Sequence, residues 1–204
     1  MNALMDTPNL LSPPNQNWND TSWKPNEEPS LLQGVIESLI DGVLILTEQS
    51  KLVYANRYAR HLCDRLIKDA SRASSIPNQI WHLCQALIDS RNIFPGQPVM
   101  LEDEVGNGKS DAIRIRVRWI ELDKTEEPYL LVMMEDRYQS ARRKAIAEGQ
   151  RYKLTAREAE VWLYRCMQYT YDEIAAQLHI TVNTVKKHVK SINAKRETFL
   201  YLNQ

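Results

Sequence analysis

The sequence is short of cysteine, of glycine and of long apolar runs, and each shortage excludes a class of protein. Its three cysteines, Cys63, Cys84 and Cys166, lie far apart and form no Cys-x-x-Cys pair, so we expect neither a disulfide framework nor a zinc site. No apolar run approaches the roughly 18 residues that a membrane span needs. No basic start followed by an apolar stretch marks a signal peptide. We therefore expect a cytoplasmic protein with no membrane contact.

Motifs of catalysis are also missing. The sequence has no glycine-rich phosphate loop and no nucleophile elbow. The strand-like stretch LILTEQSKLVYAN lacks the acidic cluster of a phosphorylated receiver domain. We therefore expect a protein that is not an enzyme.

The charge is unevenly distributed, although 26 basic and 26 acidic residues cancel over the 204 residues. Between Ala141 and Arg196 there are 12 Lys and Arg against five Asp and Glu, so this segment carries +7 and the remainder −7. Such a division indicates a segment that binds a polyanion, joined to a segment with another task.

Residues 1–30 are rich in Asn, Pro, Ser and Thr, and five prolines interrupt any helix. Their aromatic residues are Trp18 and Trp23. This composition is typical of a disordered arm. The alternative is that the two tryptophans dock on a partner or on the body of the chain.

Residues 31–137 carry a mixed pattern of helices and strands. Helical spacing or β-branched alternation predicts helices over 31–40, 57–67 and 80–90, and strands over 43–47, 52–55, 99–105, 112–121 and 129–135. The strand 112–121 alternates between apolar residues on one face and three arginines on the other. Asn56 is a candidate helix cap. Residues 138–152 are polar and alanine-rich, and we interpret them as a connecting helix.

The stretch LIDGVLILTEQSKLVYANRYARHL resembles the opening of a PAS domain, and the resemblance covers roughly 31–137. It implies five antiparallel strands with helices on one face, a cavity between them, and a role in sensing or dimerisation. No cofactor is evident, and the ligand of such a cavity is unknown. His82 could bind haem, but a surface histidine is the alternative. Cys63 and Cys84 could sense redox state, but both occupy apolar helical positions typical of inert core cysteines.

The sequence of residues 153–204 predicts three short helices, each with a side-chain cap at its start. Thr155 with Glu158 and Thr170 with Glu173 have capping-box spacing, and Thr181 is a third N-cap. The close succession of the last two helices describes a helix-turn-helix, with a third helix from about Thr181 to Lys195.

The residue pattern of this third helix predicts a surface that reads DNA. Val185, Val189 and Ile192 form its buried stripe, and its outer face is polar and basic, which suits the major groove of double-stranded DNA. Asn183 and Lys187 are the candidates for contacts to base edges. The candidates for contacts to phosphates are Thr184, Lys186, His188 and Lys190. A solvated surface helix is the alternative interpretation of the lysines.

The C-terminal segment also resembles the LuxR-type (NarL-type) DNA-binding domain over about 152–197. The matching residues are Leu154-Thr155-x-Arg157-Glu158-x-Glu160-Val161, Glu173-Ile174-Ala175-x-x-Leu178 and Thr184-Val185-Lys186-x-His188. The resemblance implies that the helix with Thr184 to His188 reads DNA and that a fourth helix, here 197–202, takes part in dimerisation. Tyr169, His179 and Glu197 depart from the family pattern.

These observations predict an α+β chain: a PAS-like antiparallel sheet domain with helices, followed by an all-α LuxR-type helix-turn-helix domain. The function that follows is a homodimeric transcription regulator whose PAS-like part senses a signal or mediates dimerisation. Two alternatives stay open. One is an adaptor that contacts RNA polymerase or another regulator, and the other is a cofactor-binding redox sensor.

Overall fold

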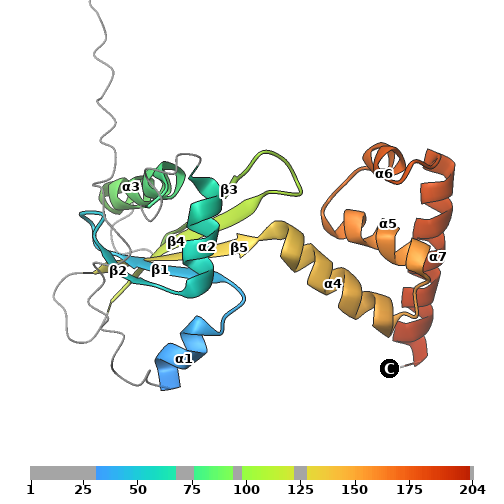
Figure 1. Cartoon of the computed structure of the whole chain (residues 1–204), viewed down its shortest axis with the longest axis horizontal. Helices are drawn as coiled ribbons and strands as arrows, with labels where there is room; N and C mark the ends of the chain where they lie inside the picture. The colour runs from blue at the N-terminus through green and yellow to red at the C-terminus, as the bar shows by residue number, and fades with distance from the viewer. Residues whose placement is uncertain (1–30, 68–75, 94–97, 122–127, 203–204) are drawn as a thin grey trace, which may run out of the picture. The chain divides into compact units, whose positions relative to one another are not determined.

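The computed structural model describes residues 31–67, 76–93, 98–121 and 128–202, and Trp18 and Trp23 lie outside these ranges. Within them the chain divides into two compact units. The first is drawn from Met1–Asp103 and Ile115–Met134, and the second from Glu104–Arg114 and Glu135–Gln204. The α+β class predicted from the sequence is confirmed, because a five-stranded sheet with helices precedes a helical C-terminal region (Figure 1).

The sheet has the strand order β2-β1-β5-β4-β3. Strand β1 lies at its interior and pairs antiparallel with β2 and with β5, in a register that places Leu44 beside Ala55 and Val132. The elements from α1 to β5 are α1 Leu31–Glu37, β1 Gly42–Leu46, β2 Leu52–Ala55, α2 Arg57–Leu66, α3 Asn78–Ile93, β3 Met100–Val105, β4 Ile113–Ile120 and β5 Tyr129–Asp136.

The core of this sheet region follows the alternation of its strands. In β4 the residues Ile113, Ile115 and Val117 are buried, and the arginines between them are partly or fully exposed, as the sequence predicts. The buried side chains of α2 and α3 complete the apolar core; they are Ala59, Leu62, Cys63, Ile80, Trp81, Cys84 and Leu87. The backbones of β1 and α2 pack closely at Gly42, where an added Cβ would lie 2.9 Å from the Cα of Ala59.

Asn56 is the polar centre of the N-terminal half, and its predicted capping role is confirmed. Its fully buried side chain accepts the backbone N–H groups of Ala59 (2.8 Å) and Val43 (3.0 Å) through Oδ1. Its Nδ2 donates to the carbonyl oxygens of Ile36 (3.1 Å) and Asp41 (2.9 Å). One amide therefore ties the end of α1, the start of β1 and the start of α2 together.

Helix α1 is shorter than the predicted helix over 31–40. It ends at Glu37, where two side chains donate hydrogen bonds to its last carbonyl oxygens. The Nδ2 of Asn56 donates to the carbonyl of Ile36, and the Ser38 hydroxyl donates to the carbonyl of Val35 (2.8 Å). These bonds satisfy carbonyl oxygens that a continuing helix would use. The apolar residues Leu39 and Ile40 follow the helix and are exposed.

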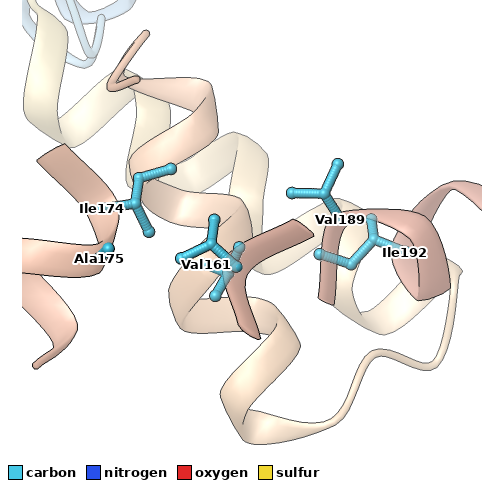
Figure 2. Close-up of a cluster of buried hydrophobic side chains, with 6 residues drawn as sticks. Val161, Ile174, Ala175, Val189 and Ile192 are labelled. Carbon is cyan, nitrogen blue, oxygen red and sulfur yellow. The ribbon is translucent and has the colours of Figure 1, made fainter. Parts of the chain in front are cut away.

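The second unit contains four helices: α4 Arg137–Arg151, α5 Ala156–Cys166, α6 Tyr171–Leu178 and α7 Val182–Leu202. Its core combines Val161 of α5, Ile174 and Ala175 of α6, and Val185, Val189 and Ile192 of α7 (Figure 2). The stripe predicted for the third helix is therefore buried. None of the helices in the described parts of the chain is long and apolar enough to cross a membrane.

Helix α7 corrects the predicted end of the reading helix near Lys195 and the separate fourth helix over 197–202. It runs without a break for 21 residues, from Val182 to Leu202. No glycine or proline interrupts this segment, and the Thr198 hydroxyl returns to the carbonyl of Ala194 (2.9 Å). Phe199 packs edge-on against Tyr152, with ring centroids 5.5 Å apart, and so fixes the continuation to the end of α4.

Candidate nucleic-acid interface

Side-chain caps set the starts of the three C-terminal helices. Thr155 and Glu158 form a complete capping box on α5, in which the Thr155 N–H donates to Glu158 Oε2 at 2.7 Å. Thr170 and Glu173 repeat the arrangement on α6, again at 2.7 Å. The Thr184 N–H donates to Thr181 Oγ1 (3.2 Å) at the start of α7. All three caps predicted from the sequence are present, and they fix where each helix begins.

The turn between α6 and α7 is made by residues 179–181. His179 ends α6 in the left-handed conformation, with φ 52° and ψ 46°, where helices commonly carry glycine. The Ile180 N–H bonds to the carbonyl of Ala175 (3.0 Å), and Arg157 of α5 donates to the carbonyl of Leu178 (2.9 Å). His179 therefore holds the left-handed position with a side chain that is strained there.

The outward side of α7 carries exposed cations. Asn183, Lys186, Lys187 and Lys190 are exposed, and Thr184 and His188 are half-buried beside the core stripe. Within the described part of the chain, Lys186, Lys187 and Lys190 make no ion pair. Some other basic residues of this unit are paired, for example Arg157 with Glu160 and Lys195 with Glu158. The structure thus brings the six predicted residues onto one exposed half of α7 and leaves its three outward lysines uncompensated.

Glu158 attaches one flank of α7, which carries Ser191 and Lys195, to the start of α5. Its side chain is nearly buried and accepts bonds from Lys195 (2.6 Å), Ser191 (2.7 Å) and the Thr155 cap. Burial alone would raise the pKa of Glu158, but the Lys195 ammonium and the other donors outweigh it and lower the pKa to about 2. The carboxylate therefore stays charged and orients α7 through this flank.

A hollow beside the basic face adds residues that the sequence did not single out. Its lining combines Tyr171 from the first turn of α6 with six residues of α7: Lys186, Val189, Lys190, Asn193, Ala194 and Glu197. The ring of Tyr171 also lies under the Arg165 guanidinium, 5.2 Å from its centroid. The position of Tyr171, directly after the Thr170 cap, was the available signal, since the first turn of a helix exposes free N–H groups.

Helix α4 is part of the same packing. The Trp162 Nε1 donates to Glu148 of α4 (2.6 Å), and the Arg196 guanidinium of α7 lies over the Trp162 ring at 4.9 Å. The Arg196 guanidinium also lies over the Tyr152 ring, 5.7 Å from its centroid. The predicted connecting helix is thus packed against α5 and α7 within one unit.

The candidate redox and haem positions lie elsewhere. His82 is exposed on α3, on the side away from the buried Trp81 and Cys84. Burial raises the pKa of the Cys84 thiol to about 12 and also raises the pKa of the Cys63 thiol, with a smaller contribution from Asp64. Neither thiol is therefore poised to ionise. Among the described residues no cluster of three or more His, Cys, Asp or Glu could hold a metal ion.

The helix-turn-helix segment is similar to known proteins. Residues 153–191 match the family described as Sigma-70, region 4. The chain is 38% identical over 88 residues to the response regulator protein VraR of Staphylococcus epidermidis and, at the same identity and length, to that of Staphylococcus aureus. In each case the match covers 43% of this chain and 38% of VraR. The chain thus spans well under half of these relatives.

Two solved structures are similar at low identity. A PAS domain from Desulfitobacterium hafniense matches with 18% identity and a TM-score of 0.34, over 50% of this chain and 98% of the other. The phage VqmA–DPO complex matches with 17% identity and a TM-score of 0.39, over 82% of this chain and 83% of the other.

Proposed function

Taking residues 153–191 as a helix-turn-helix of the sigma-70 region 4 family, we propose that this chain is a transcription regulator that binds double-stranded DNA through α7. Asn183 and Lys187 read base edges. Thr184, Lys186, His188 and Lys190 contact phosphates. The division follows from position on the helix, because the two base readers point furthest from the core and the others flank them.

The observation that carries this proposal is the set of lysines without partners. Lys109, Arg157 and Lys195 of the second unit are held by carboxylates. Lys186, Lys187 and Lys190, in contrast, face outward from a helix whose opposite side is packed into the core. A helix-turn-helix with free cations on its second helix suits the major groove and its flanking phosphates. The three caps and the Glu158 anchor hold this helix rigidly, which base reading requires.

The remaining parts of the chain extend the proposal. We assign the segment 31–137 the role of a PAS-like sensing or dimerising domain, and 138–152 that of the helix leading to the DNA-binding segment 153–204. The regulator acts in the cytoplasm as a homodimer on a two-fold DNA site, and contact with RNA polymerase belongs to the alternative adaptor function. The exposed Leu200 and Leu202 at the end of α7, with Ile146 on α4, offer apolar surface for a second copy.

The experiment that tests the function is genome-wide mapping of the sites that the full chain occupies. A DNA-reading dimer enriches sites that share an inverted repeat, with half-sites about one helical turn apart. A purified chain then binds these sites more tightly than random duplex. Occupancy that follows RNA polymerase with no shared sequence would instead support the adaptor. A visible absorption band of the purified protein would support the redox sensor.

A further inference from the structure

Lys109 lies against the start of α6, although it is far from that helix in the sequence. Its ammonium donates to both carboxylate oxygens of Glu173, at 2.7 and 2.9 Å, and to the carbonyl of Gln168 at 3.2 Å. It also lies over the ring of Tyr169, 4.7 Å from the centroid. All three N–H donors of the ammonium are thus directed at the turn between α5 and α6 and at the first turn of α6.

The backbone of the hairpin turn presents this lysine. Gly106 has φ +143°, and a Cβ there would lie 2.6 Å from the carbonyl oxygen of Asp111, so no other residue fits without a shift of the backbone. The Asp111 N–H closes the turn onto the carbonyl of Gly108 (3.1 Å). The segment Glu104–Arg114 belongs to the same compact unit as α5, α6 and α7, so the turn is a built part of that unit.

Glu173 is the one member of the α6 capping box whose charge opposes DNA. Its carboxylate is exposed and lies in the same helical turn as Tyr171, which borders the hollow with Lys186 and Lys190. A phosphate approaching the first turn of α6 would meet the negative charge of Glu173, and charges act over about 10 Å at 0.1 M salt. The Lys109 ammonium compensates that charge at contact distance.

We propose that Lys109 is a positioning residue of the DNA interface, which neutralises Glu173 and thereby opens the first turn of α6 to the phosphate backbone. The inference rests on the proposed DNA binding and deepens it. The capping box needs the Glu173 oxygen atoms to hold the Thr170 N–H, and DNA binding is favoured by less negative charge on this turn, which also carries the exposed Asp172. A cation supplied by the β3–β4 hairpin satisfies both requirements.

The test is a double-mutant cycle on Lys109 and Glu173. The measured quantity is the affinity of the full chain for a DNA duplex, at about 50 and about 200 mM salt. Lys109→Ala should weaken binding about three- to tenfold at the lower salt, and the difference should shrink at the higher salt. Lys109→Arg should bind as the wild type does. Glu173→Gln keeps the capping box, because Gln serves at that position, and should bind more tightly than the wild type. The double variant Lys109→Ala/Glu173→Gln should return to within about twofold of the wild type, because it leaves no carboxylate to neutralise.

Four results would overturn the proposal. Tighter binding by Lys109→Ala would make the lysine a restraint on DNA binding. A loss that does not depend on salt and accompanies a lower unfolding temperature would assign it to packing alone. A double variant as weak as Lys109→Ala would show that Lys109 does not act through Glu173. An affinity of Lys109→Ala equal to that of the wild type would also overturn it.

Two controls keep this inference separate from the proposed function. Lys51→Ala removes an exposed lysine of the first unit and should leave binding unchanged. Lys187→Ala weakens binding if α7 reads DNA. Normal binding by Lys109→Ala beside weak binding by Lys187→Ala would therefore refute the role of Lys109 and leave the function standing.

Discussion

The Lys195 ammonium lies 2.6 Å from the Glu158 carboxylate, and this ion pair joins the C-terminal half of α7 to the first turn of α5. The same carboxylate caps α5 through Thr155 and accepts a bond from Ser191. Because α7 is continuous, a constraint on its flank at Ser191 and Lys195 also fixes the rotation of the outward face with Lys187. Base reading thus depends on a carboxylate that does not touch DNA.

The stability of the second unit should depend on pH through Glu158. Folding lowers the pKa of Glu158 from 4.5 to about 2, so its contribution to stability is complete above pH 4.5 and is lost as the pH falls toward 2. Unfolding temperatures of the wild type and of Glu158→Gln, measured by circular dichroism between pH 6 and pH 2, should differ most at pH 6 and converge at the acid end. A constant difference over this range would contradict the assignment.

Asn56 supplies a test of the first unit. Asn56→Ala removes two acceptor contacts and two donor contacts in a fully buried site, so we expect a loss of about 2–4 kcal/mol in the free energy of unfolding. Denaturant titration measures this loss. Ser38→Ala removes a single exposed bond and is the matched control, with a loss below about 0.5 kcal/mol. Equal effects of the two substitutions would contradict the role given to Asn56.

His179 offers a stabilising substitution. A residue with a Cβ is strained in the left-handed conformation that His179 adopts, whereas glycine is not. We therefore expect His179→Gly to raise the free energy of unfolding by about 0.5–1 kcal/mol. His179→Ala keeps the Cβ and should give no such gain. If alanine stabilises as much as glycine, the imidazole itself, and not the backbone strain, is unfavourable.

Replacement of Lys187 and replacement of Lys186 should weaken DNA binding in different ways. Lys187→Ala should cost about 1–3 kcal/mol of binding to the preferred site and relax the preference at one base position. Lys186→Ala should weaken preferred and random duplexes alike, because phosphates carry no sequence. Competition binding with both kinds of duplex separates the outcomes. Equal losses on both duplexes from Lys187→Ala would remove it from the base-reading set.

Local signals predicted most of the elements. Strand β2 has the predicted bounds, and the starts of α1, α2 and β5 agree as well, because turn residues and caps such as Asn56 mark them. In the C-terminal segment the capping boxes and the stripe of Val185, Val189 and Ile192 are local patterns that tertiary contacts reinforce. The sequence therefore predicted the helix-turn-helix and the side of α7 that faces outward.

Contacts between distant residues could not be predicted in this way. The pairing of Lys109 with Glu173 joins residues 64 positions apart and depends on the shape of a glycine turn. The end of α1 depends on a bond from Asn56, 20 residues further on. The continuation of α7 through Leu202 depends on the packing of Phe199 against Tyr152. None of these relationships leaves a periodic or spaced pattern in the sequence.

The central claim is that the free lysines of α7 bind the phosphates and bases of duplex DNA, and a salt titration tests it most directly. The measurement is the affinity of the full chain for its preferred duplex, by fluorescence anisotropy, as a function of salt, for the wild type and for Lys186→Ala/Lys187→Ala/Lys190→Ala. The account predicts that the logarithm of the wild-type affinity falls steeply and linearly with the logarithm of the salt concentration, with a slope reduced by roughly two to three in the triple variant. Absence of duplex binding at low salt, or equal slopes for the two proteins, would contradict it.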